Sequence, residues 1–451
     1  MSCTFTFTQE LPQLKHFSAA DILQRLSTLD GLIYLHDHGQ AVIGFFPQQY
    51  QITQHDTQQF IRQSDLSYRA SSTAELWQDW IQCDAATAPK TNPQTQFQGG
   101  WMGFIGYDYA AKQNVHAPQQ QQPAVYLGKY LSFLKYAQNT WTFYSLEENA
   151  ADIYDKLITY LEKSPNQNTF QITIPCTARW SKTEYVAAFN RVIDYIRAGD
   201  CYQINLTQQF MGQAQGALVE TAEQFWQLTH APYAGYLRVA DFELLSCSPE
   251  LFIEFKNNQQ IVTRPIKGTM PRHSNPIQDE LSKQTLQSSL KDQAENVMIV
   301  DLLRNDLSIF AEIGSVKTNQ LFEIESFEQV HHMVSEVEAT LKADVQPMQM
   351  LLQALPGGSI TGAPKIRAMQ IIAELEQQAR GAYCGSLGYF NLNGTGRWNI
   401  LIRSIQKYQQ DISMWAGGGI TIASNAEAEY QECFDKISAM LNLLNTWHKE
   451  A

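Results

Sequence analysis

The sequence predicts an α+β fold in which short antiparallel strands lie beside separate amphipathic helices. The segments 32–46 and 382–404 each hold two apolar, strand-like runs on either side of a turn, a pattern typical of a β-hairpin. The segments 181–184 and 424–427 both read Ser-x-x-Glu, the capping box that begins a helix, and apolar residues at helical spacing follow each of them. Hairpins beside capped helices favour the α+β class.

The N-terminal third of the chain mixes strands with helices. Apolar residues at helical spacing predict a helix from Ser71 to Cys83. The glycine-rich, aromatic run 99–109 predicts a strand that packs closely on another element, and it lacks the G-x-G-x-x-G pattern of a dinucleotide site. The linker-like run 163–168 separates a first region, 1–162, from a second region, 180–447. We expect the two regions to form one compact unit.

The second region continues with strands and helices in turn. A capped helix begins at Ser181 and ends before Gly199, a residue suited to a helix C-terminus. The other segments expected to be helical are 290–304, 366–375 and the stretch after 424. The segments expected to be strands are 202–207, 237–247, 251–255, 260–263 and 413–416.

Composition limits the class of protein and its partners. The chain has 451 residues, of which 44% are hydrophobic and 17% charged, values typical of a folded globular protein. A net charge of −13 without a long basic run argues against nucleic acid as a partner. The seven cysteines include no C-x-x-C pair, so reduced thiols are favoured over disulfides or zinc. No signal peptide pattern and no stretch of ~20 apolar residues is present, so we expect a cytoplasmic protein without membrane attachment.

Lys267 stands where a strand ends and a permissive turn begins. The run 260–263 is strand-like, Pro265 removes one backbone donor, and Gly268 lets the backbone approach a ligand closely. A lysine that is partly desolvated has a lowered pKa and can act as a base or a nucleophile. The alternative is a solvated lysine at the end of a strand.

Two predicted helices each carry two acidic residues three positions apart. Asp292 and Glu295 project from nearly the same stripe as apolar residues, where a carboxylate is costly unless it is paired or binds a cation. Glu429 and Glu432 form a second such pair on the last helix. Four carboxylates of this kind suit Mg²⁺. The alternatives are a favourable helix dipole for Asp292 and a solvated face for the second pair.

Two further features indicate a site for carboxylates. The glycine-rich loop 356–365 leads into a helix N-terminus, which suits an anion, but it lacks the Gly-Lys-Ser/Thr ending of a phosphate-binding loop. We expect a carboxylate or a structural turn there and not ATP. Arg403 lies in an isoleucine-rich run expected to be a strand, where its charge needs either a substrate carboxylate or a neighbouring acid.

Five motifs of the second region occur together and in one order. They are 265–269, 294–306, 331–335, 357–365 and 427–432. With these motifs the chain resembles the chorismate-utilising enzymes, and most closely the aminodeoxychorismate synthase component I branch. The resemblance extends over nearly the whole chain. It implies the fold of anthranilate synthase component I, two packed antiparallel sheets that form a sandwich core with helices outside.

The resemblance implies a magnesium site next to a site for chorismate, which carries two carboxylates. Glu295 and Glu432 would hold Mg²⁺ directly, while Asp292 and Glu429 would act through waters, and the metal would bind the ring carboxylate. The residues implied to bind the substrate are Gly268, Thr269, His332, Gly418 and Gly419 at the ring carboxylate, Tyr383 and Arg403 at the enolpyruvyl carboxylate, and Thr361.

The resemblance also implies how the reaction proceeds. Lys267 would add to C2 of the ring and expel the 4-hydroxyl, after which ammonia would enter at C4 and expel the lysine, giving 4-amino-4-deoxychorismate in a reaction of the transaminase class. Glu250 would act as the general acid and base. Gln203 stands where members that add water carry a lysine, and an amide cannot serve as that base.

A partner and two alternatives follow from the same resemblance. Ammonia would come from a separate glutamine amidotransferase subunit, and the product would lead to 4-aminobenzoate and folate. The alternatives are anthranilate synthase component I, which usually has alanine at the position of Lys267, and a non-catalytic regulatory paralogue. Many members also have a tryptophan pocket near residues 35–37, but this stretch departs from their common pattern.

Overall fold

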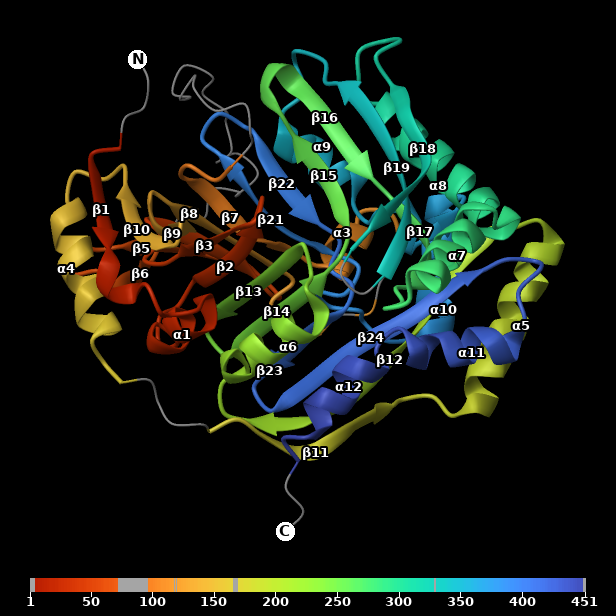
Figure 1. Cartoon of the computed structure of the whole chain (residues 1–451), viewed down its shortest axis with the longest axis horizontal. Helices are drawn as coiled ribbons and strands as arrows, with labels where there is room; N and C mark the ends of the chain where they lie inside the picture. The colour runs from red at the N-terminus through yellow and green to blue at the C-terminus, as the bar shows by residue number, and fades with distance from the viewer. Residues whose placement is uncertain are drawn as a thin grey trace.

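The computed structural model describes residues 5–71, 96–116, 118, 120–164, 169–327 and 330–448. Two large antiparallel sheets pack on each other, and helices cover their outer sides (Figure 1). Apart from Ser71, the helix expected from Ser71 to Cys83 lies outside the described residues. Among the helices that are described, none has the length and apolar character needed to cross a membrane.

The first sheet runs in the order β1, β10, β9, β3, β2, β13, β14, β23, β24, β12, β11, with β20 beside β12. Its strands are β1 (Phe7–Leu11), β2 (Leu32–Asp37), β3 (Gln40–Gly44), β9 (Ser132–Ala137), β10 (Thr140–Ser145), β11 (Gln171–Ala178), β12 (Gln203–Gln215), β13 (Tyr233–Val239), β14 (Phe242–Ser248), β20 (Gly362–Ala363), β23 (Ser404–Tyr408) and β24 (Asp411–Ile420). The hairpin expected within 32–46 is confirmed, because β2 pairs with β3 across a two-residue turn at His38 and Gly39.

The second sheet runs in the order β17, β19, β16, β15, β22, β21, β7, β8, β4, β5, β6, with β18 beside β19. Its strands are β4 (Gln49–Thr53), β5 (Thr57–Arg62), β6 (Tyr68–Ala70), β7 (Gly100–Ile105), β8 (Val125–Tyr130), β15 (Leu251–Phe255), β16 (Gln260–Arg264), β17 (Ile266–Pro271), β18 (Lys317–Ser326), β19 (Val330–Thr340), β21 (Ser386–Asn391) and β22 (Gly396–Asn399). The strand expected in the run 99–109 covers Gly100–Ile105, whereas Tyr107–Ala111 forms the helix α3, and the expected close packing is confirmed for the strand. A Cβ added at Gly103 of β7 would lie 2.0 Å from the Tyr126 carbonyl oxygen.

The helices lie mainly on the outer sides of the two sheets. They are α1 (Ala19–Arg25), α3 (Tyr107–Ala111), α4 (Ala150–Leu161), α5 (Lys182–Ala198), α6 (Ala222–Thr229), α7 (Pro276–Gln287), α8 (Leu290–Ser308), α9 (Pro347–Ala354), α10 (Lys365–Glu376), α11 (Ala426–Asp435) and α12 (Ser438–Asn445). Figure 1 shows α5, α11 and α12 near the long strands β12 and β24, and α7 and α8 near β17 and β18.

The sandwich core consists of side chains from both sheets. Phe104 of β7 and Phe242 of β14 stack with their ring centroids 5.3 Å apart, and Leu387 of β21 belongs to the same buried cluster. A second buried cluster joins the first sheet to α1, α4, α5 and α12, and a third joins the second sheet to α8 and α9. The predicted α+β sandwich with helices outside is therefore confirmed.

Each sheet contains strands from both regions of the sequence, arranged as two blocks that meet at one strand pair. In the first sheet β2 pairs with β13, and Leu35 lies opposite Gly235. In the second sheet β7 pairs with β21, and Ile105 lies opposite Ser386. Because neither region contains a complete sheet, we propose that the two regions form one compact unit.

The last helical segment differs from its expected form. The predicted capping box placed Ser424 at the N-cap, but Asn425 occupies this position and its side chain accepts from the amides of Glu427 and Ala428. The Ser424 hydroxyl instead donates to Glu429 Oε1 at 2.7 Å. Helix α11 also ends at Asp435, and the chain continues as the separate helix α12. Asparagine is as good an N-cap as serine, so local sequence does not separate the two choices.

Candidate active site

A cavity of about 370 Å³ is lined by residues of β12, β17, β19, β24, α8 and α11 together with the loops beside them. Twelve of the predicted site residues line it, so residues far apart in the sequence share one site. They are Glu250, Lys267, Gly268, Thr269, Asp292, Glu295, His332, Tyr383, Arg403, Gly419, Glu429 and Glu432.

The other two predicted site residues, Thr361 and Gly418, lie behind the cavity lining. Thr361 is fully buried, and its hydroxyl donates to the Gly357 carbonyl at 2.9 Å while its own carbonyl accepts from the Asn205 amide at 2.8 Å. A Cβ added at Gly418 would lie 2.8 Å from Glu429 Oε2 and 2.9 Å from a carboxylate oxygen of Glu432. Thr361 thus supports one wall of the cavity, while Gly418 leaves room for two acidic side chains.

Lys267 lies in an irregular stretch of β17. The pairing of β17 with β19 shifts register between Ile266 and Thr269, and Gly268 has a φ of +81°, which favours glycine. The lysine therefore sits one residue before a bend and faces the cavity. Desolvation lowers the pKa of Lys267, and the positive charge of Lys436 lowers this pKa further. Such a lowered pKa increases the share of neutral, nucleophilic amine.

Glu250 lies beside Lys267 at the start of β15. Its side chain is 6% exposed, and burial raises the pKa of Glu250 to about 7, although the charge of Lys267 acts in the opposite direction. The Ser359 hydroxyl lies 3.5 Å from Glu250 Oε1, which makes it a weak donor at most. A carboxyl with a pKa near neutrality can both give and take a proton.

The two acid pairs lie on different helices that face the same cavity. Asp292 and Glu295 belong to α8, and Glu429 and Glu432 belong to α11. Burial raises the pKa of both Glu295 and Glu429. Asp292 and Glu295 are half-buried, whereas Glu429, whose stripe taken alone predicts a solvated face, is only 5% exposed.

Two lysines contact the acid pairs. Lys436 Nζ lies 2.6 Å from Glu432 Oε1 and donates to the Gly417 carbonyl at 2.8 Å. Lys291 Nζ lies 3.9 Å from Glu295 Oε1. Both lysines line the cavity, so their positive ammonium groups lie next to the negative carboxylates of the acid pairs.

The donor set at the acid pairs fits a hard divalent cation. Within the part of the chain that the structure describes, no three His, Cys, Asp or Glu side chains are already gathered as a metal cage. However, Glu429 Oε2 is buried and has no hydrogen-bond partner among the described residues, which is costly for a carboxylate oxygen. A cation such as Mg²⁺, which takes one or two carboxylates and completes its shell with other oxygens, would satisfy it.

Thr269 and His332 face each other across β17 and β19. They are register partners, and the Thr269 hydroxyl lies 2.9 Å from His332 Nδ1. Burial lowers the pKa of His332 to about 4, and the charge of Arg403 acts in the same direction. His332 is therefore neutral at neutral pH, and it can offer a hydrogen bond to a carboxylate without adding a charge.

Arg403 and Tyr383 lie on irregular segments of the cavity wall. The prediction that Arg403 belongs to a strand is wrong: β22 ends at Asn399, β23 begins at Ser404, and Arg403 has a φ of +49°. Among the described residues no carboxylate lies within 4.0 Å of its guanidinium, so the expected partner is not a neighbouring acid of that part of the chain. Tyr383 stacks on Trp415 with ring centroids 5.9 Å apart.

Several cavity residues were not singled out from the sequence. They are Asn205, Ser359, Trp415, Lys291 and Lys436. Lys436 follows Glu432 by four positions, and this spacing predicts that it lies on the same helix stripe as Glu429 and Glu432. That stripe alone, however, is typical of a solvated helix face. For Asn205 and Trp415 the only signal is the register of β12 and β24, which local patterns do not reveal.

Comparison with known proteins places the chain in a family. The sequence pattern of the chorismate binding enzymes matches residues 32–442. The chain belongs to this family. It is 40% identical over 360 residues to the aminodeoxychorismate synthase component 1 of Salmonella typhimurium, with 79% of each chain covered, and equally to that of Escherichia coli.

Solved structures of chorismate binding enzymes show the same fold. The anthranilate synthase component I from Streptococcus pneumoniae superposes with a TM-score of 0.75 at 25% identity, covering 89% of this chain and 92% of the other. The twelve predicted residues that share one cavity thus belong to a chorismate binding enzyme with the anthranilate synthase component I fold.

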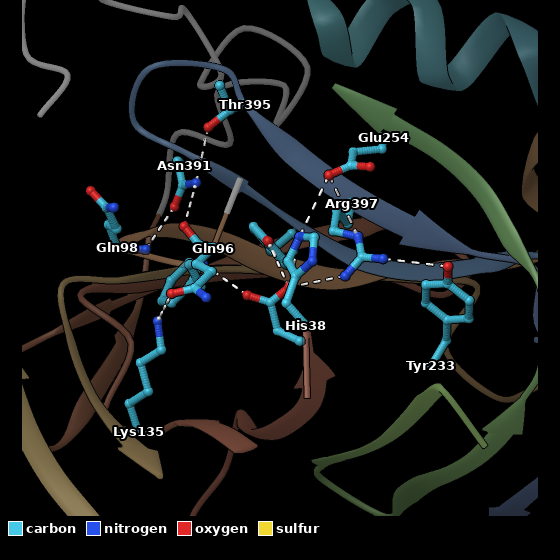
Figure 2. A network of polar contacts seen from close by, with 12 residues as sticks. His38, Gln96, Gln98, Lys135, Tyr233, Glu254, Asn391, Thr395 and Arg397 are labelled. Atoms are coloured by element: carbon cyan, nitrogen blue, oxygen red, sulfur yellow. Dashed lines mark hydrogen bonds and ion pairs between the residues drawn. The ribbon is translucent and has the colours of Figure 1, made fainter. Parts of the chain in front are cut away.

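A polar cluster outside the cavity lining links the two sheets of this chorismate binding enzyme (Figure 2). Asp37 of β2, 1% exposed, accepts from the Phe97 amide at 2.9 Å and from the Tyr389 hydroxyl at 3.0 Å. Arg397 of β22 lies 3.4 Å from Asp37 Oδ1 and donates to the Tyr233 hydroxyl at 3.3 Å. The stretch that departs from the family's tryptophan-pocket pattern thus contributes a carboxylate with protein partners on both oxygens.

Proposed function

We propose that the protein converts chorismate and ammonia to 4-amino-4-deoxychorismate, with Lys267 as the nucleophile. The observation that carries this proposal is the lysine itself, desolvated in the cavity beside a buried carboxyl, Glu250, whose pKa is raised to about 7. The similarity to aminodeoxychorismate synthase component 1 of two bacteria supports the same product.

Lys267 and Glu250 together provide the nucleophile and the proton transfers that the reaction needs. The neutral amine of Lys267 would bond to C2 as the two conjugated ring double bonds shift and the 4-hydroxyl leaves as water with the proton of Glu250. The proton that the lysine nitrogen then loses would return to Glu250. Ammonia would next bond to C4, the two double bonds would shift back, and Lys267 would leave C2 with that proton. The net change replaces a hydroxyl by an amine, and because the nitrogen would come from glutamine as the amino-group donor, we place the enzyme in the transaminase class.

The remaining lining residues would orient the two carboxylates of chorismate. Arg403, which lacks an acidic partner among the described residues, and Tyr383 would receive the enolpyruvyl carboxylate. Thr269, neutral His332 and the backbone at Gly419 would receive the ring carboxylate. Holding both ends fixes C2 near the lysine, and such positioning is a large part of catalytic rate.

We propose that Mg²⁺ binds between α8 and α11. Glu295 and Glu432 would hold the ion directly, and Asp292 and Glu429 would do so through waters. When bound, the ion would neutralise the ring carboxylate and withdraw electrons from the ring. Glu429 and Glu432 also need space for this arrangement. Gly418 provides the space, because a side chain there would press against both carboxylates.

We propose that a separate glutamine amidotransferase supplies the ammonia and that the product enters 4-aminobenzoate and folate synthesis. The bacterial relatives are named component 1, which fits an enzyme that works with a second chain. We also expect the enzyme to act in the cytoplasm, in line with the free, buried thiols of the described residues Cys176, Cys201 and Cys247.

The test is a product assay with chorismate, Mg²⁺ and ammonium, resolved by chromatography. The wild-type enzyme should form 4-amino-4-deoxychorismate, and Lys267→Ala should lose at least about a hundredfold in rate, because the nucleophile is gone. Lys156→Ala serves as the matched control, since Lys156 is an exposed lysine of α4. Anthranilate from the wild-type enzyme would favour the anthranilate synthase reading, and no turnover with either product would favour a non-catalytic paralogue.

A further inference from the structure

Arg380 is a buried arginine behind one wall of the cavity. Its side chain is 1% exposed, and it does not line the cavity itself. Burying a guanidinium costs several kcal/mol unless it is paired and all of its donors are satisfied. The groups that Arg380 contacts therefore show which segments of the structure it stabilises.

The guanidinium of Arg380 reaches two segments of the wall at once. Nη1 donates to the Ile360 carbonyl at 3.1 Å, and Nη2 donates to the Asn205 carbonyl at 2.8 Å. Ile360 ends the short helix η5 (Gly358–Ile360), and Asn205 belongs to β12, so the two carbonyls come from distant parts of the sequence. Both residues line the cavity, and Asn205 Nδ2 also donates to the Ile360 carbonyl at 3.0 Å.

A carboxylate and an aromatic ring hold Arg380 in place from the other side. Glu376 of α10, 1% exposed, accepts from Arg380 Nε at 2.8 Å and from Nη2 at 2.7 Å. Glu376 is itself held by the amide and hydroxyl of Thr207, at 3.0 and 2.8 Å. The guanidinium carbon also lies 4.7 Å from the ring centroid of Tyr107 and 5.9 Å from that of Tyr383, a cavity residue.

The backbone of Arg380 is tied to a third element. Its amide donates to Asp108 Oδ1 at 3.1 Å, and the Gly381 amide donates to Asp108 Oδ2 at 2.7 Å. The Arg380 carbonyl accepts from Gln406 Nε2 at 3.0 Å and from the Tyr383 amide at 3.2 Å. The segment that carries Tyr383 is thus fixed relative to α3 and β23.

From these contacts we infer that Arg380 is a positioning residue for the reaction. Its planar guanidinium fixes the positions of Asn205, Ile360 and Tyr383 relative to one another in the wall of the cavity. The inference rests on the proposed function of that cavity. Arg380 touches no substrate and acts only through these three residues. Lysine cannot replace it, because a single ammonium does not reach two carbonyls and a carboxylate in the fixed planar geometry of a guanidinium.

The experiment compares Arg380→Lys with wild type in the chorismate, Mg²⁺ and ammonium assay. We expect kcat/KM for chorismate to fall roughly tenfold or more, since a small displacement of positioning groups costs that much in rate. Arg62→Lys is the matched control. Arg62 is also buried and pairs with a buried acid, Glu147, but neither residue lines the cavity. This control should lower the melting temperature while changing kcat/KM less than about twofold.

A second variant separates positioning from stability. The double change Arg380→Gln with Glu376→Gln removes both buried charges and leaves neither one unpaired, so its melting temperature should return toward that of wild type. Its kcat/KM should stay roughly tenfold or more below wild type. The inference is overturned if kcat/KM recovers together with the melting temperature, or if Arg380→Lys matches the Arg62→Lys control. A wild-type enzyme without turnover would instead contradict the proposed function.

Discussion

At the scale of single residues, desolvation acts on Glu250 and Lys267 in opposite directions. It raises the pKa of the carboxyl and lowers the pKa of the amine, so both groups shift toward their neutral forms. Each charge opposes the shift of the other, yet burial remains the larger cause for both. A proton donor and an unprotonated nucleophile can therefore coexist at one pH.

This pairing predicts a pH dependence. In the proposed reaction Glu250 gives a proton to the leaving 4-hydroxyl, and its pKa is raised to about 7. Above that pH the protonated share of Glu250 falls, so kcat/KM for chorismate should decline about tenfold per pH unit once the Lys267 amine is fully neutral, when free ammonia is held constant. A series of initial-rate measurements between pH 6 and pH 9 provides the check.

Glu250→Gln is the control for the pH profile. A glutamine cannot give a proton, so this variant should be at least about a hundredfold slower and should lack the decline above pH 7. If the decline persisted in Glu250→Gln, another group would be responsible for it.

At the scale of elements, the bend in β17 decides where Lys267 points. Sequence patterns located the strand, Pro265 and Gly268, and they also located the acid pairs of α8 and α11, because both features follow local periodicity. They did not locate Arg403 in a loop, since an isoleucine-rich run looks like a strand wherever the fold places it.

The bend predicts the effect of Gly268→Ala. The added Cβ would lie 2.8 Å from Leu286 Cδ1 and 3.0 Å from Asp292 Cγ, at a φ of +81°. We expect the free energy of unfolding to fall by about 1 to 2 kcal/mol and kcat/KM to fall by roughly tenfold or more, because Lys267 and Asp292 shift together. Denaturant titration and steady-state kinetics measure the two effects.

Gly199→Ala is the matched control for backbone strain. Gly199 has a φ of +83° but has open space around its position, so the same backbone strain arises without a contact at the cavity. Its unfolding free energy should also fall by about 1 kcal/mol while kcat/KM stays near the wild-type value. Equal losses of kcat/KM in the two variants would show that general destabilisation, and not the bend, affects the rate.

At the scale of the whole molecule, strand order was beyond the reach of local sequence patterns. Hairpins such as β2 and β3 are predictable because a short turn joins them. The pairing of β2 with β13 and of β7 with β21 depends on contacts over long sequence separations, as does the meeting of α8 and α11 at one cavity. Arg380 illustrates the limit, since nothing in its neighbourhood in the sequence shows that it reaches β12.

The shared sheets predict that the second region cannot fold alone. A fragment of residues 180–448 would lack β2 and β7, so β13 and β21 would each expose an unpaired edge, and the sandwich core would lose the ring of Phe104. We expect no cooperative thermal transition for this fragment by circular dichroism, whereas the full chain should show one. A fragment that melts cooperatively and binds chorismate would refute the proposal of one compact unit.

The pairing of β7 with β21 has a consequence for synthesis on the ribosome. Ile105 can pair only after Ser386 has been synthesised, roughly 280 residues later. At about 5 to 20 residues per second this delay lasts roughly 15 to 60 seconds. During that interval the finished strands β7 and β8 have an unpaired edge and exposed apolar side chains such as Phe104. The nascent chain must therefore avoid aggregation at this edge until β21 has left the exit tunnel. We expect chaperones to protect it during that time.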